Sequence, residues 1–387
     1  MSGQASQIPN LNSLRGQRGG LRGLARRRGP PADPDHVVTQ QDSEAKRDAV
    51  IQQTDNDASQ SRMSAVALNY LDDQFARSFV TQPIPRKYPI INRGTYVRTT
   101  GIDRLVDAFL ATDLSERKQI VSLGAGSDTR FLRRARPNLV YHELDFASNT
   151  ATKIAIIQQS SLLKDTITQS LTEPSSLEIN AEKTALYSPT LNIHPIDLRE
   201  LVAPSTLPTL PNLDPKLPTL VLSECCLCYI APESTAKILS TLQTLLQGPS
   251  SIILYEPVRP YDSFGKTMVQ NLGSRGIELR TVKKYYSLAA QRLRLKQAGF
   301  DAGQGARSIE DIYYGHAEEA WLADLERQRV ERLEWLDEIE EWKLLGRHYC
   351  ITWAWKDSPE QDIFSRAWKD IRGGYTNAEV GDEELLS

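Results

Sequence analysis

An apolar run followed by a glycine-rich turn is the feature that most constrains the fold of this chain. The run opens the segment QIVSLGAGSDTR, residues 119–130, and predicts a short buried strand. Gly124 and Gly126 let the backbone turn sharply beneath a ligand, where any side chain would clash. Asp145 closes the next predicted strand, 21 residues beyond Gly124, the usual place for a carboxylate that binds ribose hydroxyls. The pattern predicts a Rossmann-like α/β domain that binds an adenosyl group.

The third position of the glycine pattern discriminates between cofactors. The dinucleotide fingerprint GxGxxG needs a third glycine so that the helix can pack closely over a pyrophosphate, but here that position is Thr129. A bare GxG is expected for S-adenosylmethionine, which has no phosphate groups. The phosphate-binding motif GxxxxGK[ST] does not occur in the sequence. The turn therefore favours a methyl-donor site.

Later segments repeat the strand pattern and end in an acidic residue or just after one. Predicted strands cover residues 191–197, 219–225 and 250–257, and a closing strand covers 348–355. Ligands of open α/β sheets bind at the carboxyl ends of parallel strands, so we expect four strand-end acids to meet in one crevice. These acids are Asp145, Asp197, Glu224 and Glu256. Periodicity predicts helices over residues 63–80, 101–110 and 317–345.

Composition divides the chain into a folded region and two tails. Residues 1–60 open with an arginine-rich, glycine-rich stretch, with six arginines and no acid between residues 15 and 31, and we expect them to be disordered. A plain solvated tail, an RNA contact, a nuclear signal and an organelle presequence are all compatible with that stretch. The predicted folded domain covers residues 61–356 with internal loops at 160–190 and 204–218, and residues 357–387 are an acidic tail.

Charge and cysteine usage exclude several classes of protein. A net charge of −3 over 387 residues argues against a protein that coats nucleic acid. Cys225, Cys226, Cys228 and Cys350 offer no disulfide framework, and no apolar run is long enough to span a bilayer, so we expect a cytoplasmic protein with no membrane partner. In a strand, Cys226 and Cys228 would share one face and Cys225 the other, which disfavours a metal site. The motifs HExxH and GxSxG are absent as well.

Several segments in matching order, over about residues 60–356, together resemble the leucine carboxyl methyltransferases. They are RKYPIINRGTYVRTTG, IVSLGAGSDTRF, the HELDF strand, SECCLCYI, YEPVRPYDSFGKTMVQNL and RHYCITWA. The resemblance implies a class I S-adenosylmethionine-dependent methyltransferase with a Rossmann-like, mostly parallel sheet and helical lid insertions. It also implies the reaction, which is esterification of the C-terminal leucine carboxylate of the catalytic subunit of protein phosphatase 2A.

The resemblance assigns the cofactor site to named positions. Arg98 would pair with the methionyl carboxylate of the donor, and Glu224 would face its amino group. Asp145 would bind the ribose hydroxyls, while Asp197 and Leu198 would hold the adenine. The full expected set is Arg98, Gly124, Gly126, Asp145, Asp197, Leu198 and Glu224. Two of these have a plainer interpretation: Arg98 as a surface ion-pair partner, and Asp197 as the cap of a following helix.

The expected chemistry needs no general base, because a C-terminal carboxyl group with a pKa of about 3.5 is ionised at neutral pH. Arg62, which stands where the family usually has lysine, and Tyr229 are the residues expected to orient the substrate carboxylate. The N-terminal helices and the segment after Pro257 are expected to roof the crevice. We expect a monomer in the cytoplasm, with the nucleus as a further location and RNA contact only through the arginine-rich tail.

Two other classes stay open at this stage. One is a related methyltransferase that acts on tRNA or on a small-molecule acid. The other is a phosphatase-binding protein that holds the cofactor without turnover.

Overall fold

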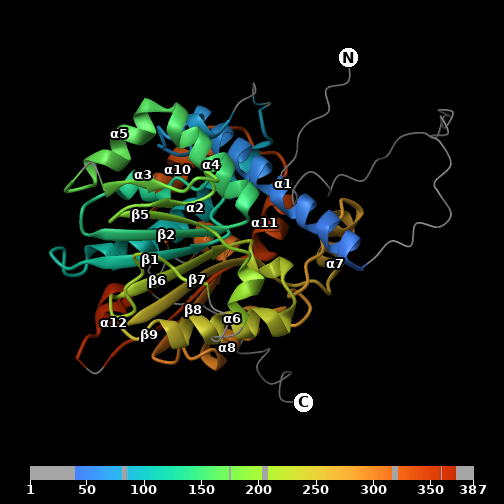
Figure 1. The fold of residues 1–387 in the computed structure, drawn as a ribbon. Coiled ribbons are helices and arrows are strands. Elements are labelled where there is room, and N and C mark those ends of the chain that lie inside the picture. The colour runs from blue at the N-terminus through green and yellow to red at the C-terminus, as the bar shows by residue number, and fades with distance from the viewer. Residues whose placement is uncertain are drawn as a thin grey trace, which may run out of the picture.

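A single sheet of nine strands organises the part of the chain that the structure describes (Figure 1). The structure is a computed structural model, and it describes residues 40–80, 84, 86–173, 176–202, 208–315, 321–358 and 360–371. The strand order is β3-β4-β5-β2-β1-β6-β7-β9-β8. The parallel core consists of β5 (Leu191–Pro195), β2 (Leu139–Asp145), β1 (Lys118–Leu123), β6 (Thr219–Glu224) and β7 (Ser250–Pro257). Antiparallel pairs add β3 (Glu178–Ile179), β4 (Leu186–Tyr187), β9 (Tyr349–Lys356) and β8 (Gly303–Ser308) at the two edges.

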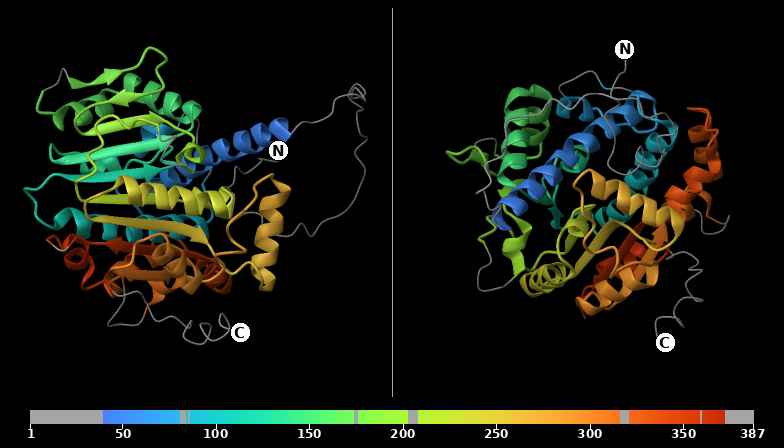
Figure 2. Two further views of the ribbon diagram at one scale, coloured as in Figure 1. Left: turned by 60° about the horizontal axis from the view of Figure 1, so that its bottom comes forward. Right: turned by 90° about the vertical axis from the view of Figure 1, so that its right-hand side faces the viewer.

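The core strands are apolar on both faces because helices cover both (Figure 2). Alternate residues of β1 separate accordingly: Ile120 packs into one buried cluster, while Val121 and Leu123 pack into the other. The first cluster takes side chains from α2 (Pro89–Ala111), α3 (Arg130–Arg134), α4 (Ala147–Gln159), α5 (Ser161–Gln169), α7 (Ser263–Ser274), α9 (Ile309–Tyr314), α10 (Asp324–Glu331), α11 (Ile339–Arg347) and α12 (Ile363–Trp368). The second takes side chains from η4 (Leu198–Val202), α6 (Pro232–Leu245) and α8 (Leu288–Gln297).

The topology is that of a class I methyltransferase, as the sequence predicted. The chain moves from β1 through β2 to β5 on one side and then returns through β6 to β7 on the other. The carboxyl ends of β1 and β6 therefore flank the point where strand order reverses, which is where open α/β sheets bind ligands. β9, antiparallel between β7 and β8, completes the sheet. No helix in the described ranges combines the length and the apolar character needed to cross a membrane.

The expected disorder of residues 1–60 is wrong for their described part, because helix α1 (Gln40–Ala67) begins at Gln40. The sequence pattern did not predict this helix, since residues 40–57 include few apolar residues and the helix is held by polar contacts to residues far along the chain. Asp48 pairs with Arg199, and Gln52 accepts from Ser148. Residues 1–39 lie outside the described part of the chain.

Other expected loops and helices also differ from the structure. Segment 160–190 contains α5, β3 and β4 rather than a loop, and the described part of 204–218, residues 208–218, contains no helix or strand. The expected helix 63–80 is divided: α1 ends at Ala67, and η2 (Ala76–Phe79) follows after a turn. The predicted helix 317–345 is two helices, α10 and α11, in the described residues. The acidic tail begins later than residue 357, because Phe364 and Trp368 of α12 are buried.

A buried histidine pair between β2 and β5 gives the fold a predictable acid response. His142 Nδ1 lies 3.0 Å from His194 Nε2. Burial lowers the pKa of His194 to about 4 and that of His142 well below its ordinary value. The unfolded chain therefore binds more protons than the folded chain between pH about 6.5 and 4, so these groups destabilise the fold as pH falls through that window.

Replacing one of them should remove part of this response. As pH falls below about 6, the free energy of unfolding of His194→Gln should rise relative to that of the natural chain by about 1.4 kcal/mol per pH unit. Urea denaturation at pH 7.5, 6 and 5 measures this, with pH 7.5 as the baseline for the packing cost of the substitution. A constant difference across the three values would contradict it.

Candidate functional site

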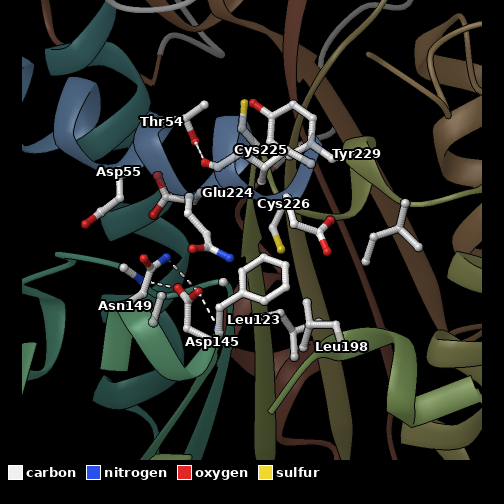
Figure 3. A pocket seen from close by; sticks show the side chains of 18 of the residues that line it. Thr54, Asp55, Leu123, Asp145, Asn149, Leu198, Glu224, Cys225, Cys226 and Tyr229 are labelled. Carbon is white, nitrogen blue, oxygen red and sulfur yellow. Dashed lines mark hydrogen bonds between the residues drawn. The ribbon is translucent and has the colours of Figure 1, made fainter. Parts of the chain in front are cut away.

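A cavity of about 680 Å³ opens at the carboxyl ends of the parallel strands. Its floor comes from the turn after β1 and from the ends of β2, β5 and β6, and α1 lies across it (Figure 3). Thr54 and Asp55 of α1 lie on one side of it, and Asp145 and Leu198 lie below. The volume is in the range of sites for small molecules and cofactors. The cavity contains every residue that the sequence assigned to the cofactor or to substrate orientation.

The turn after β1 has the close backbone approach that the glycine pattern predicted. Gly124 has φ +64° and Gly126 has φ +45°, both in the left-handed region. A Cβ on Gly124 would collide with the Cys226 sulfur, and one on Gly126 would collide with the Asp55 carboxylate. We call this turn, residues 124–127, the glycine cradle. It also holds α1 in place, because Asp55 accepts hydrogen bonds from the Ser127 backbone N–H and hydroxyl.

Asp145 is held in one orientation at the end of β2. Its carboxylate accepts from the backbone N–H groups of Gly126 and Phe146, each at 2.7 Å, and from the Asn149 side-chain amide at 2.9 Å (Figure 3). Burial raises its pKa, although these hydrogen bonds oppose the rise. A fixed carboxylate beside a glycine cradle suits a vicinal diol such as ribose.

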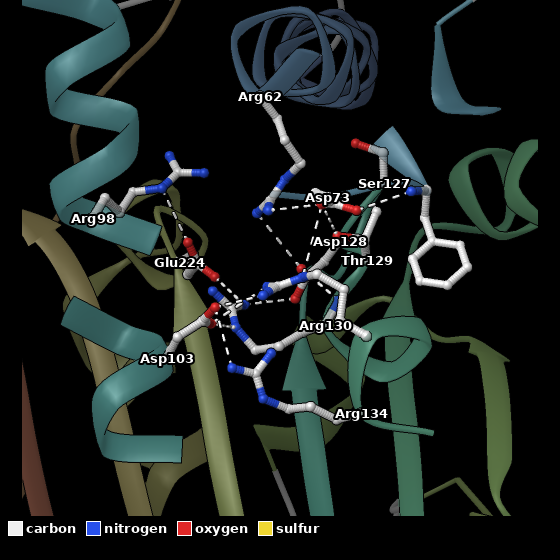
Figure 4. A network of polar contacts seen from close by, with 12 residues as sticks. Arg62, Asp73, Arg98, Asp103, Ser127, Asp128, Thr129, Arg130, Arg134 and Glu224 are labelled. Atoms are coloured by element: carbon white, nitrogen blue, oxygen red, sulfur yellow. Dashed lines mark hydrogen bonds and ion pairs between the residues drawn. The ribbon is translucent and has the colours of Figure 1, made fainter. Parts of the chain in front are cut away.

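The methionyl end of the expected donor has a matching charge pair. Arg98 Nε, from α2, lies 3.1 Å from Glu224 Oε2 at the end of β6 (Figure 4). Both atoms are buried. They form an ion pair with each other, but neither has a partner in hydrogen-bond geometry among the described residues. An α-carboxylate and an α-ammonium would complete both, so these residues fit the zwitterion of S-adenosylmethionine. Burial opposes the charge on Arg98, but Glu224 raises its pKa above the ordinary value.

Beneath this pair lies the buried side chain of Arg130, the first residue of α3. Its guanidinium contacts Asp103 at 2.7 Å, Asp128 at 2.7 Å and Glu224 at 2.5 Å (Figure 4). The three acids come from α2, the glycine turn and β6. Burial would raise the pKa of Asp128, but Arg130 and Arg62 lower it to about 2. Arg130 therefore contacts both the ionised carboxylate of Asp128 and Oε1 of Glu224, and it fixes the orientation of the Glu224 side chain.

Arg62 belongs to the same network rather than standing free in the cavity. Its guanidinium lies 3.3 Å from Asp73 and 3.7 Å from Asp128, and burial lowers its pKa. Arg62 lines the cavity with its charge already paired, and its expected role in orienting a substrate stays a prediction.

Asp197 has the capping contact that the sequence left open as one of its two roles, and its adenine contact stays a prediction. Its carboxylate accepts from the Arg199 backbone N–H at 2.9 Å, a capping contact at the start of η4. The Arg199 guanidinium also pairs with Asp197 at 2.5 Å and with Asp48 of α1 at 2.6 Å. Asp197 and Leu198 both line the cavity, where they are placed to contact an adenine. Arg199 therefore joins the proposed adenine site to α1.

Two expectations at the strand ends are wrong. The cysteines do not continue β6: the strand ends at Glu224, Cys225 takes a left-handed φ of 48°, and η6 (Leu227–Tyr229) follows. Glu256 does not reach the cavity, because side chains alternate along β7 and its carboxylate turns toward α8, where it pairs with Arg294 at 2.8 Å. No group of three metal-ligating residues exists in the described ranges, and the absence of a metal stays a prediction.

Four functional residues were not expected from the sequence: Asp48, Asp55, Arg130 and Arg199. A signal for the first two was present. Asp48, Asp55 and Arg62 are spaced by seven residues, which places them on one face of a helix. That polar face lies over the cavity. Arg130 and Arg199 had no comparable signal, since the acids that join them to other elements of the fold are 27 or more positions away.

The sheet topology, the glycine cradle and the charge pair define a class I methyltransferase that uses S-adenosylmethionine. The family model described as leucine carboxyl methyltransferase matches residues 47–243. The chain belongs to this family.

Relatives support the assignment over almost the whole chain. Leucine carboxyl methyltransferase 1 of Aspergillus fumigatus is 46% identical over 95% of this chain and 98% of its own length. The protein of the same name from Emericella nidulans is 44% identical, also over 95% and 98%. Among solved structures, magnesium protoporphyrin IX methyltransferase from Synechocystis with bound SAH aligns with 81% of this chain and all of its own, at 12% identity and a TM-score of 0.39.

Removing the buried cation should destabilise the fold strongly. Arg130→Met leaves Asp103, Asp128 and Glu224 each short of a partner, so we expect a loss of about 3–5 kcal/mol in the free energy of unfolding. Urea denaturation measures the loss. Arg327→Met, which breaks a solvent-accessible pair with Asp324 on α10, is the matched control and should cost less than about 1 kcal/mol. Equal losses in the free energy of unfolding for the two variants would contradict the structural role given to Arg130.

The hydrogen bonds between α1 and the glycine turn should contribute to donor binding. Asp55→Ala removes the two hydrogen bonds to Ser127, and we expect donor affinity to fall about tenfold. Calorimetric titration with S-adenosylhomocysteine measures the change. Gln53→Ala, on the exposed face of the same helix, is the control and should leave affinity unaltered.

Proposed function

We propose that this methyltransferase forms a methyl ester on the C-terminal leucine carboxylate of the protein phosphatase 2A catalytic subunit. The family supports a leucine carboxyl methyltransferase, and the phosphatase subunit as substrate is the further step. The observation that carries the proposal is the lining of the cavity, which offers groups to bind a donor and an anion and contains no histidine to act as a general base.

The two carboxylates nearest the proposed donor, Asp145 and Glu224, are already engaged by other residues. The lining contains no histidine, Glu224 is paired with two arginines, and Asp145 is occupied by three hydrogen bonds. An ionised carboxylate needs no base to become a nucleophile. When bound, S-adenosylmethionine supplies the methyl group: a carboxylate oxygen forms the new bond to carbon as the carbon–sulfur bond breaks, and sulfur keeps the electron pair.

The protein's contribution is to orient the two reactants and to exclude water. Arg98 and Glu224 would hold the methionyl end of the donor, Asp145 the ribose, and Asp197 with Leu198 the adenine. Tyr229 would orient the substrate. Burial raises the pKa of Tyr229 well above its ordinary value, so the phenol keeps its proton and can donate a hydrogen bond to a carboxylate. The expected monomeric state and cytoplasmic location remain predictions.

Transfer of a labelled methyl group tests the proposal. The enzyme and labelled donor are incubated in separate reactions with one candidate acceptor each. The acceptors are the phosphatase catalytic subunit, the same subunit lacking its terminal leucine, tRNA and small carboxylic acids. Base-labile label on the intact subunit alone supports the proposal. Label on tRNA or on a small acid would replace it with the related activity, and donor binding without transfer would indicate a non-catalytic protein.

The absence of a base predicts a flat pH profile. With the donor and the phosphatase subunit saturating, kcat should change less than about twofold between pH 6.5 and 8.5, because neither the substrate carboxyl nor Tyr229 titrates there. A bell-shaped or sigmoidal profile centred in this range would show that a titrating group takes part.

Loss of the Tyr229 hydroxyl should affect the acceptor and not the donor. Tyr229→Phe removes one hydrogen bond to a charged group, so we expect kcat/KM for the phosphatase subunit to fall about 10–100-fold. The Kd for S-adenosylhomocysteine should stay the same. A parallel loss of donor affinity would place Tyr229 in the cofactor site instead.

A further inference from the structure

Four cations gather beside the opening of the cavity. They come from the segment after β7 and from the segment that leads into α8, and all are exposed; we call them the basic rim: Arg259, Arg280, Lys283 and Lys284. The two segments are fastened together, because the Arg259 backbone N–H donates to the Tyr286 carbonyl at 2.7 Å and the Tyr261 hydroxyl donates to the Lys283 carbonyl at 2.9 Å. The rim is therefore one surface.

Arg280 connects this surface to the reaction site. It lines the cavity, and its backbone N–H donates to the Cys228 carbonyl at 2.8 Å, beside Tyr229. The other arginines of the lining are all paired with carboxylates: Arg47, Arg62, Arg98 and Arg199. Arg280 has no ion pair with any described residue. Among the residues that the structure describes, it is the arginine of the cavity wall that no carboxylate neutralises.

The rest of the rim is also undercompensated. Lys284 lies 3.8 Å from Glu233, and both side chains are more than half exposed, so this pair contributes little. Arg259 and Lys283 form no ion pair of 4.0 Å or less within the described ranges, although Arg259 is close enough to Asp262 to lower the pKa of that carboxyl. The whole chain carries a net charge of −3, so a group of cations at the cavity is a local reversal of its overall sign.

The backbone under the rim is fixed. Arg259 has a left-handed φ of 57°, and a Cβ on Gly265 would collide with the Arg259 carbonyl, so only glycine allows α7 to pack against this turn. Asp262 caps α7 by accepting from the Gly265 backbone N–H at 2.7 Å and also accepts from His348 at 2.9 Å. The cations thus project from a defined platform rather than from a loose loop.

We infer that the basic rim is the docking surface for an acidic tail of the substrate protein, whose C-terminal carboxylate continues past Arg280 into the cavity. The inference rests on the proposed function, since that reaction places a peptide carboxylate in this cavity. Acidic side chains just before the terminal residue would pair with Arg280 and Lys283. Both cations are exposed at the rim, where water and salt weaken the attraction. Inside, the paired arginines leave the acceptor carboxylate to be held by Tyr229.

The experiment uses the full chain and two fluorescent decapeptides ending in a free leucine, one with two aspartates upstream and one with two lysines. Binding by anisotropy in the presence of S-adenosylhomocysteine, and methylation with labelled donor, are both measured. The acidic peptide should bind about tenfold more tightly, and its advantage should shrink as salt rises from 0.05 to 0.5 M. Equal affinity of the two peptides would overturn the inference.

Charge reversal at the rim locates the effect. Lys283→Glu, which lies outside the cavity lining, and Arg280→Glu should each weaken binding of the acidic peptide about tenfold and strengthen binding of the lysine peptide, with the Kd for S-adenosylhomocysteine unchanged. Lys164→Glu on α5, at the other edge of the sheet, is the matched control and should alter neither. Unaltered peptide preference in both rim variants would also overturn the inference.

The two proposals fail separately. If neither peptide nor the intact phosphatase subunit acquires a base-labile methyl group, the proposed function fails. If methyl esters form but the peptides show no charge preference, the function stands and the rim is not the docking surface.

Discussion

The contact of one fully buried guanidinium with three carboxylates underlies the arrangement of the site. Arg130 joins α2 through Asp103, the glycine turn through Asp128, and β6 through Glu224. A buried charge without partners would cost several kcal/mol, so these elements must keep their relative positions for the fold to be stable. The orientation of Glu224, and through it that of Arg98, follows from this structural requirement. The geometry of the donor site is thus set by the same ions that stabilise the core.

The parts of the fold that could be predicted from the sequence are those specified locally. The strand, the glycine turn and the strand-end carboxylate of Asp145 depend on residues close together in the chain, and the predicted topology and cofactor are confirmed. Convergence of Asp145, Asp197 and Glu224 followed from the parallel sheet. Glu256 was placed wrongly because the prediction used its position at a strand end but not its face: Glu224 lies opposite Tyr255, and the next side chain along β7 points the other way.

What could not be predicted depends on contacts between distant segments. Residues 40–57 of α1 include few apolar residues, and they are held by Asp48 with Arg199 and Asp55 with Ser127, partners 72 or more positions away. Composition alone therefore indicated a tail. The burial of Arg130 is similar, since arginine is rarely buried and only the assembled fold shows three acids around it. The lack of an ion-pair partner for Arg280 among the described residues could not be predicted either, since in the sequence it is one of 46 lysine and arginine residues.

The polar attachment of α1 also bears on how the enzyme renews its donor. The helix crosses the cavity, yet residues 40–57 are fastened there by hydrogen bonds and ion pairs through Asp48, Gln52, Asp55 and Asp57. Water can replace such contacts at little net cost, whereas it cannot replace the apolar packing between the sheet and its covering helices. Detachment of this part of α1 would therefore uncover the cavity and leave every strand paired.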